Sequence, residues 1–177
     1  MILIRSIILI VSFILSGPVY SQTANSTVTI TLPVVTLMDV EPTGNITLNF
    51  TAPTEAGNAL GNPTPNTSKW INYTSAITPA GLTRRITASV NKVIDGVNIR
   101  LQAAAASGAG GGTLGTSSGQ VALTTTPVTV ISGIGGAYTG NGANNGHRLT
   151  ISLVPNNYAN VLTQANTAIT IVYTITE

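Results

Sequence analysis

The sequence predicts an all-β fold of the β-sandwich class, and three observations lead to that prediction. Aliphatic residues alternate with polar ones, chiefly threonine, in several short segments. Glycine, asparagine and proline separate those segments, and no segment has the apolar period of a helix. An antiparallel sandwich buries one face of each sheet and exposes the other, which suits such alternation. We expect about eight or nine strands with Ig-like connectivity, and a jelly roll is the alternative.

The first 21 residues have the order of regions typical of a secretory signal peptide. Arg5 supplies a positive charge, residues 6–15 are almost entirely apolar, and a Gly-Pro pair ends that run before the small residue Ser21. The apolar run is shorter than the ~20 residues that a membrane span needs. We therefore expect cleavage after Ser21, which leaves residues 22–177 as a single secreted domain with no membrane span.

The exported part begins with an alternating segment. Residues 26–32 read S-T-V-T-I-T-L, which places Val28, Ile30 and Leu32 on one face and threonines on the other. Extended chain resumes after a proline, so the sequence predicts an N-terminal extended strand over residues 22–38.

Further strand patterns occupy residues 45–51, 69–74, 85–90, 97–101, 121–123, 128–130, 148–154 and 168–176. The dipeptide Asp95-Gly96 is a hairpin signal, so the two strands beside it are expected to pair with each other. Prolines and glycines predict a surface loop over residues 52–68. Glycine-rich and polar composition predicts flexible loops over residues 107–119 and 133–146.

The last strand pattern has a clear apolar face. Over residues 168–176, Ile169, Ile171, Tyr173 and Ile175 alternate with polar or exposed positions. This segment is therefore expected to be part of the fold and to contribute to its core.

The composition excludes several classes of function. Charged residues make up 7% of the chain and the formal net charge is +2, which is too little positive charge for a nucleic-acid surface. The absence of cysteine excludes disulfides and thiolate metal sites, and one histidine cannot build a histidine metal site. No cofactor and no metal are expected.

Two motif matches are better explained by composition than by catalysis. Residues 115–119 match the G-x-S-x-G pattern around a nucleophilic serine, but no acid lies between Ser117 and the only histidine, His147. Residues 110–115 match a dinucleotide-binding glycine pattern, yet the next acid is Glu177. The sequence therefore predicts that the protein is not an enzyme and has no catalytic residues.

The aromatic residues leave a binding function open. Trp70, Tyr73, Tyr138 and Tyr158 could present rings to sugars, and Trp70 is the candidate for glycan stacking. Packing in the core or at its rim is the alternative for Trp70 and Tyr73. The chain could thus be a secreted carbohydrate-binding or adhesive β-sandwich module.

The segments 26–32 and 168–176 together resemble those of pilin-type subunits of bacterial surface fibres, closest to chaperone–usher major fimbrial subunits without cysteines. The resemblance implies a structural subunit in which Val28, Ile30 and Leu32 insert as a donated strand into the next subunit. The residues expected to line the acceptor or the core are Ile169, Ile171, Tyr173 and Ile175. The implied partners are further copies or other fibre subunits and a periplasmic chaperone, and the implied location is the bacterial cell surface after transit through the periplasm.

Overall fold

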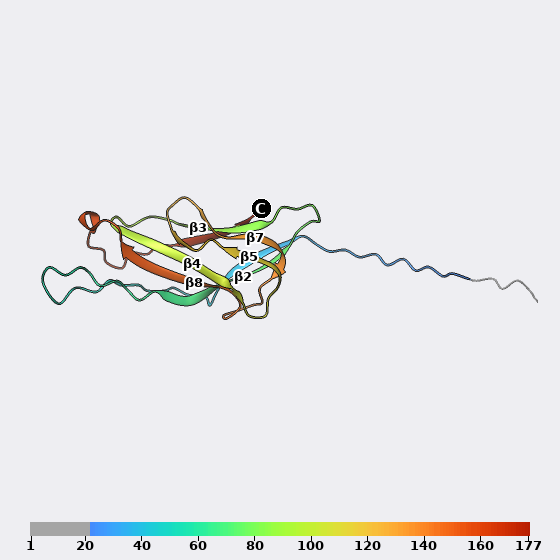
Figure 1. Cartoon of the computed structure of the whole chain (residues 1–177), viewed down its shortest axis with the longest axis horizontal. Coiled ribbons are helices and arrows are strands. Elements are labelled where there is room, and N and C mark those ends of the chain that lie inside the picture. The colour runs from blue at the N-terminus through green and yellow to red at the C-terminus, as the bar shows by residue number, and fades with distance from the viewer. Residues whose placement is uncertain (1–21) are drawn as a thin grey trace, which may run out of the picture. The chain divides into compact units, whose positions relative to one another are not determined.

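The computed structural model describes residues 22–177, so the predicted signal peptide lies outside the described residues. The described residues divide into two units at the boundary between Leu32 and Pro33. The second unit contains nine strands, several of which are labelled in Figure 1. They are β1 (Val35–Glu41), β2 (Asn66–Ala76), β3 (Arg84–Val90), β4 (Val97–Ser107), β5 (Gly111–Ser117), β6 (Gln120–Ala122), β7 (Val128–Tyr138), β8 (Gly146–Pro155) and β9 (Ile171–Thr176). Among the described residues, the helical element is the short 3-10 turn η1 (Tyr158–Asn160), and no helix there is long and apolar enough to cross a membrane.

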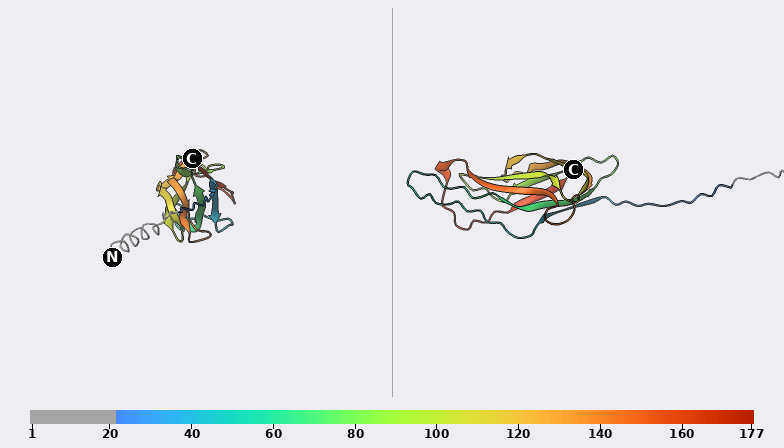
Figure 2. Two further views of the ribbon diagram at one scale, coloured as in Figure 1. Left: turned by 90° about the vertical axis from the view of Figure 1, so that its right-hand side faces the viewer. Right: turned by 60° about the horizontal axis from the view of Figure 1, so that its bottom comes forward.

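The strands pair antiparallel in the order β6-β4-β8-β2-β7-β3-β9, with β1 beside β2 and β5 beside β7. Strand β2 joins two halves, because its first part pairs with β8 while Thr74 and Ser75 pair with β7. Strand β4 lies against β5 and β7 without pairing with them. The two halves therefore face each other, as the turned views in Figure 2 show. The predicted all-β, sandwich-like fold is confirmed.

The core lies between these two halves. Ile71, Ile86, Leu101, Ile131 and Leu149 are fully buried, and they come from five different strands. Burial of one such side chain contributes roughly 1.5–3 kcal/mol to folding. The alternation of aliphatic and polar residues thus has the consequence expected of it, because inward positions of both halves meet in one apolar cluster.

The turn at Asp95-Gly96 exists, but the hairpin predicted around it is wrong. Gly96 has a φ of +77°, as a tight turn requires. Strand β3 pairs with β7 and β9, whereas β4 pairs with β6 and β8. Only the isolated bridge between Ile94 and Val97 crosses the turn. The turn reverses the chain locally, while burial of both strands decides which neighbours they pair with.

The prediction of flexible loops over residues 107–119 and 133–146 is also wrong in part. Strand β5 lies inside the first range, and β7 continues to Tyr138 in the second. These strands approach each other closely, since a Cβ added at Gly112 would lie 2.1 Å from the Gly136 carbonyl oxygen. The pairing is irregular beside Gly112. Glycine here permits a bulged, closely packed strand pair rather than a flexible loop.

Two of the predicted strands lie outside the sheet. Residues 22–34 belong to no strand, so the expected N-terminal strand is confirmed only from Val35 onward. Residues 45–50 form no ladder, and the one pairing nearby is an isolated bridge between Thr51 and Gly61. Both segments keep the alternating pattern without a strand partner in the part of the chain that the structure describes.

Candidate functional site

Residues 22–34 present an apolar face to solvent. The side chains of Val28, Ile30 and Leu32 are 76%, 75% and 87% exposed, although each would gain free energy on burial. Threonines separate them, so these three side chains share one face whenever the segment is extended. Repeated exposed aliphatic residues of this kind are typical of a surface that another chain covers.

Strand β9 has one paired and one unpaired edge. It pairs with β3 along its whole length, and no other strand of the described residues pairs with it. Ile171, Tyr173 and Ile175 are half-buried and pack on the core, whereas Val172 is exposed on the other face. Ile169 lies just before β9 and packs on the same core. The four residues predicted as acceptor or core are therefore together, and burial raises the pKa of the Tyr173 phenol above its usual range.

Strand β1 is a second edge with the same character. It pairs only with β2 within the described residues. Met38 and Val40 are half-buried against the core, and so are Ile46 and Leu48 from the extended segment that follows β1. Met38 and Val40 were not among the residues predicted for the site. The alternation of side chains that continues after Pro33 could have identified both residues.

Arg84 brings these two edges to the same end of the fold. Its buried guanidinium donates from Nη1 to the Val35 carbonyl oxygen at 2.7 Å and to Ser75 Oγ at 2.9 Å. Its Nη2 lies 3.6 Å from Glu177 Oε1, directly after β9. The start of β1 and the end of β9 therefore meet at one side chain. We call the half-buried apolar set along the two edges the open edge: Met38, Val40, Ile46, Leu48, Ile169, Ile171, Tyr173 and Ile175.

Trp70 occupies a position inside the sheet rather than in a loop. It lies on β2 with Glu41 of β1 opposite on one side and Arg148 of β8 opposite on the other. Its side chain is half-buried. Glycan stacking on Trp70 stays a prediction.

Ser117 and His147 are engaged in separate contacts. Ser117 Oγ accepts a hydrogen bond from a backbone N–H two residues later, at 3.1 Å. The buried His147 ring places Nδ1 2.8 Å from the Ala104 carbonyl oxygen and Nε2 3.1 Å from both the Leu114 carbonyl oxygen and Tyr73 Oη. Tyr73 also stacks on this ring, with centroids 5.9 Å apart. These contacts hold strands together and do not join His147 to Ser117.

No family model, curated protein or solved structure matches this chain. The features that bear on function are therefore the exposed alternating segment, the open edge and the surface chemistry of the described residues.

Proposed function

We propose that this protein is a structural subunit of an extracellular fibre at the bacterial cell surface. In this proposal, residues 22–34 of one copy add as a strand to the open edge of the next copy. The observation that supports it most directly is the exposure of Val28, Ile30 and Leu32 on a segment that belongs to no strand. A strand addition would bury all three side chains and would pair their backbone groups at the same time.

The chemistry of the two surfaces is complementary. The donor face has an aliphatic side chain at every second residue, and the inward positions of β9 at Ile171, Tyr173 and Ile175 are likewise all apolar. An unpaired strand edge presents N–H and C=O groups that another extended segment can pair with. Each aliphatic side chain buried in this way contributes roughly 1.5–3 kcal/mol, against the cost of association.

The partner in this proposal is a second copy of the chain or another subunit of the same fibre. A periplasmic chaperone would cover the open edge before assembly, as the resemblance to fimbrial subunits implies. The chain is exported by its signal peptide, acts outside the cytoplasm and has no catalytic role in the fibre.

We call residues 22–34 the donor segment. Paired substitutions on its two faces test the proposal. Protein expressed from the full-length sequence should form oligomers, measured by size-exclusion chromatography with light scattering. Ile30→Asp should convert them to monomers, because a charge would enter an apolar site. Thr29→Asp is the matched control on the opposite face and should leave the oligomers intact.

A monomeric wild-type protein would contradict the proposal, as would an equal loss of oligomers in both variants. A second measurement covers the case in which a variant misfolds. Protein lacking residues 22–32 should bind a synthetic peptide of residues 22–34, and the same peptide with Ile30→Asp should bind at least ~10-fold more weakly, which corresponds to about 1.4 kcal/mol. Equal binding of the two peptides would also overturn strand donation.

A further inference from the structure

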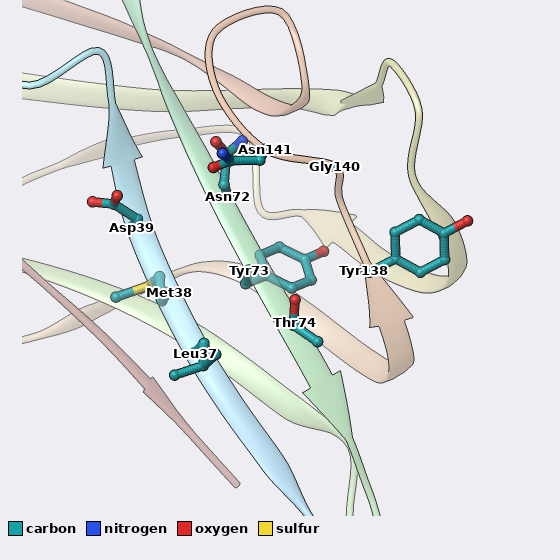
Figure 3. Close-up of a pocket in the computed structure, with 9 residues that line it drawn as sticks. All are labelled: Leu37, Met38, Asp39, Asn72, Tyr73, Thr74, Tyr138, Gly140 and Asn141. Atoms are coloured by element: carbon teal, nitrogen blue, oxygen red, sulfur yellow. The ribbon is translucent and has the colours of Figure 1, made fainter.

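A hollow on the outer face of β1 and β2 adjoins the apolar open edge and shares Met38 with it. It is a shallow hollow open to solvent, with a volume of ≈ 430 Å³, and it lies where β1, β2 and the end of β7 meet. Figure 3 shows Leu37 and Asp39 along β1 on one side, Tyr138 on the other, and Asn72 and Thr74 between them on β2. Its volume falls within the range of small-ligand sites, about 300–1,000 Å³.

Strand register arranges the lining in two rows. Leu37 is opposite Thr74, and Thr74 is opposite Tyr138, so these three side chains project from neighbouring strands on one face. Leu37 and Tyr138 are both exposed large side chains, separated by the hydroxyl of Thr74. Two residues further along β1, Asp39 is opposite Asn72 of β2. An apolar row therefore runs beside a polar row.

Asn72 forms part of the buried floor of this hollow. Its side chain is 5% exposed, and its Nδ2 donates to the Asn145 carbonyl oxygen at 2.7 Å. That carbonyl can only accept, so the amide orientation is fixed and Oδ1 is directed away from it. Among buried side-chain oxygens and nitrogens of the described residues, Asn72 Oδ1 is the one without a hydrogen-bond partner. Because Oδ1 is itself buried, Asn72 shapes the floor of the hollow and does not contact a ligand through this atom.

Tyr138 is held so that one ring face remains available. It is opposite Gly111 on β5, and a Cβ added at Gly111 would lie 3.1 Å from Tyr138 Cε1. The ring therefore lies over a residue without a side chain, and Tyr138 still remains 56% exposed. An aromatic ring supported on one side and free on the other is suited to stack on the apolar C–H face of a flat ligand.

We propose that this hollow binds one or two neutral sugar units. Hydroxyl groups would donate to the exposed Asp39 carboxylate, and a sugar ring would stack on Tyr138. The residues lining the hollow include no lysine or arginine, and Asp39 would repel an anion, so a phosphate or acidic ligand is disfavoured. No group of three or more potential metal-ligating side chains occurs in the described part of the chain, which gives a cation no comparable set of ligands.

Saturation-transfer NMR tests the proposal with four probes: lactose, maltose, cellobiose and N,N′-diacetylchitobiose. Protein expressed from the full-length sequence should transfer saturation to at least one of them, mainly at ring C–H protons. Tyr138→Ala should weaken binding of that sugar at least ~10-fold. Tyr138→Phe keeps the ring and should retain affinity within about threefold, which separates stacking from a general loss of structure.

Two control variants locate the site. Tyr158→Ala removes an aromatic residue of similar exposure, 52%, outside the hollow, and Trp70→Phe removes the indole at the other candidate position. Both should bind within about twofold of wild type, since neither residue lines the hollow. The proposal is overturned if none of the four sugars receives saturation, or if either control variant weakens binding as much as Tyr138→Ala. Ile30→Asp should not alter sugar binding and Tyr138→Ala should not alter oligomer size, so this result is independent of strand donation.

Discussion

The hydroxyl of Tyr73 lies in the core beside the only histidine of the chain. It donates to the Leu114 carbonyl oxygen and lies 3.1 Å from His147 Nε2. Burial raises the pKa of Tyr73 above its usual range. Of the two roles considered for Tyr73 from the sequence, core packing is therefore the correct one, because its ring is buried and cannot meet a sugar.

This buried phenol predicts a loss of stability at high pH. Since the pKa of Tyr73 is higher in the folded state, the unfolded chain releases the proton first, from about pH 10 upward. The free energy of unfolding should therefore be constant below that pH and fall above it, by up to about 1.4 kcal/mol per pH unit for one such group. Urea unfolding of wild type and Tyr73→Phe over this pH range would measure the difference.

Tyr73→Phe should reduce the dependence on pH, while Tyr173, whose pKa is also raised by burial, maintains part of it. At neutral pH the same variant should be about 1–2 kcal/mol less stable, because the Leu114 carbonyl loses a donor. A pH profile as steep as that of wild type would show that Tyr73 is not responsible.

At the scale of elements, the pairing of β5 with β7 depends on glycine at particular positions. Gly112 and Gly119 both have positive φ, +85° and +83°. An added Cβ at Gly112 would collide with the Gly136 carbonyl oxygen, whereas nothing lies within 4 Å of a Cβ at Gly119. Substitution of Gly119 therefore tests backbone strain alone, whereas substitution of Gly112 adds a steric collision.

Gly112→Ala and Gly119→Ala should differ in stability for this reason. Gly119→Ala carries the cost of a left-handed conformation alone, roughly 1–2 kcal/mol. Gly112→Ala adds displacement of β5 from β7 and should cost at least about 3 kcal/mol in total. Chemical denaturation of both variants measures the two values, and equal losses would mean that β5 can move away from β7 without cost.

The donor segment shows what an alternating sequence pattern leaves undetermined at the scale of elements. The alternation at residues 26–32 predicts a strand, yet the segment lies in none, while residues 171–176 with the same alternation form β9. A period of two specifies a face to bury but not the chain that buries it. Pairing of this segment within its own chain and pairing with a second copy would satisfy the pattern equally well.

At the scale of the whole molecule, very little of the stability is electrostatic. Charged residues are 7% of the chain, and the one ion pair among the described residues joins Arg84 to the partly exposed Glu177. The Arg84 guanidinium is buried, but the Glu177 carboxylate 3.6 Å away is exposed, so solvent and salt weaken this attraction. Packing and backbone pairing must therefore hold the two halves together.

Stability should accordingly be nearly independent of ionic strength. Raising sodium chloride from a low value to several tenths molar should change the thermal unfolding midpoint by less than about 2 °C, because almost no charge interactions are available to screen. Differential scanning calorimetry checks this, with Glu177→Gln as a variant that removes the ion pair. A large decrease in the midpoint with salt, abolished in Glu177→Gln, would show that this pair matters more than its exposure suggests.

The sequence alone determined the all-β class and most inward positions, such as Ile86, Leu149 and Ile171, because the period of two is a local property of the chain. It could not determine that β3 and β4 lie apart, that a glycine-rich segment forms β5, or that Leu37, Thr74, Tyr138 and Asn72 surround one hollow. Those features depend on register between strands far apart in the chain. Only the folded structure settles that register, since it is chosen by burial of both halves at once rather than by any one segment.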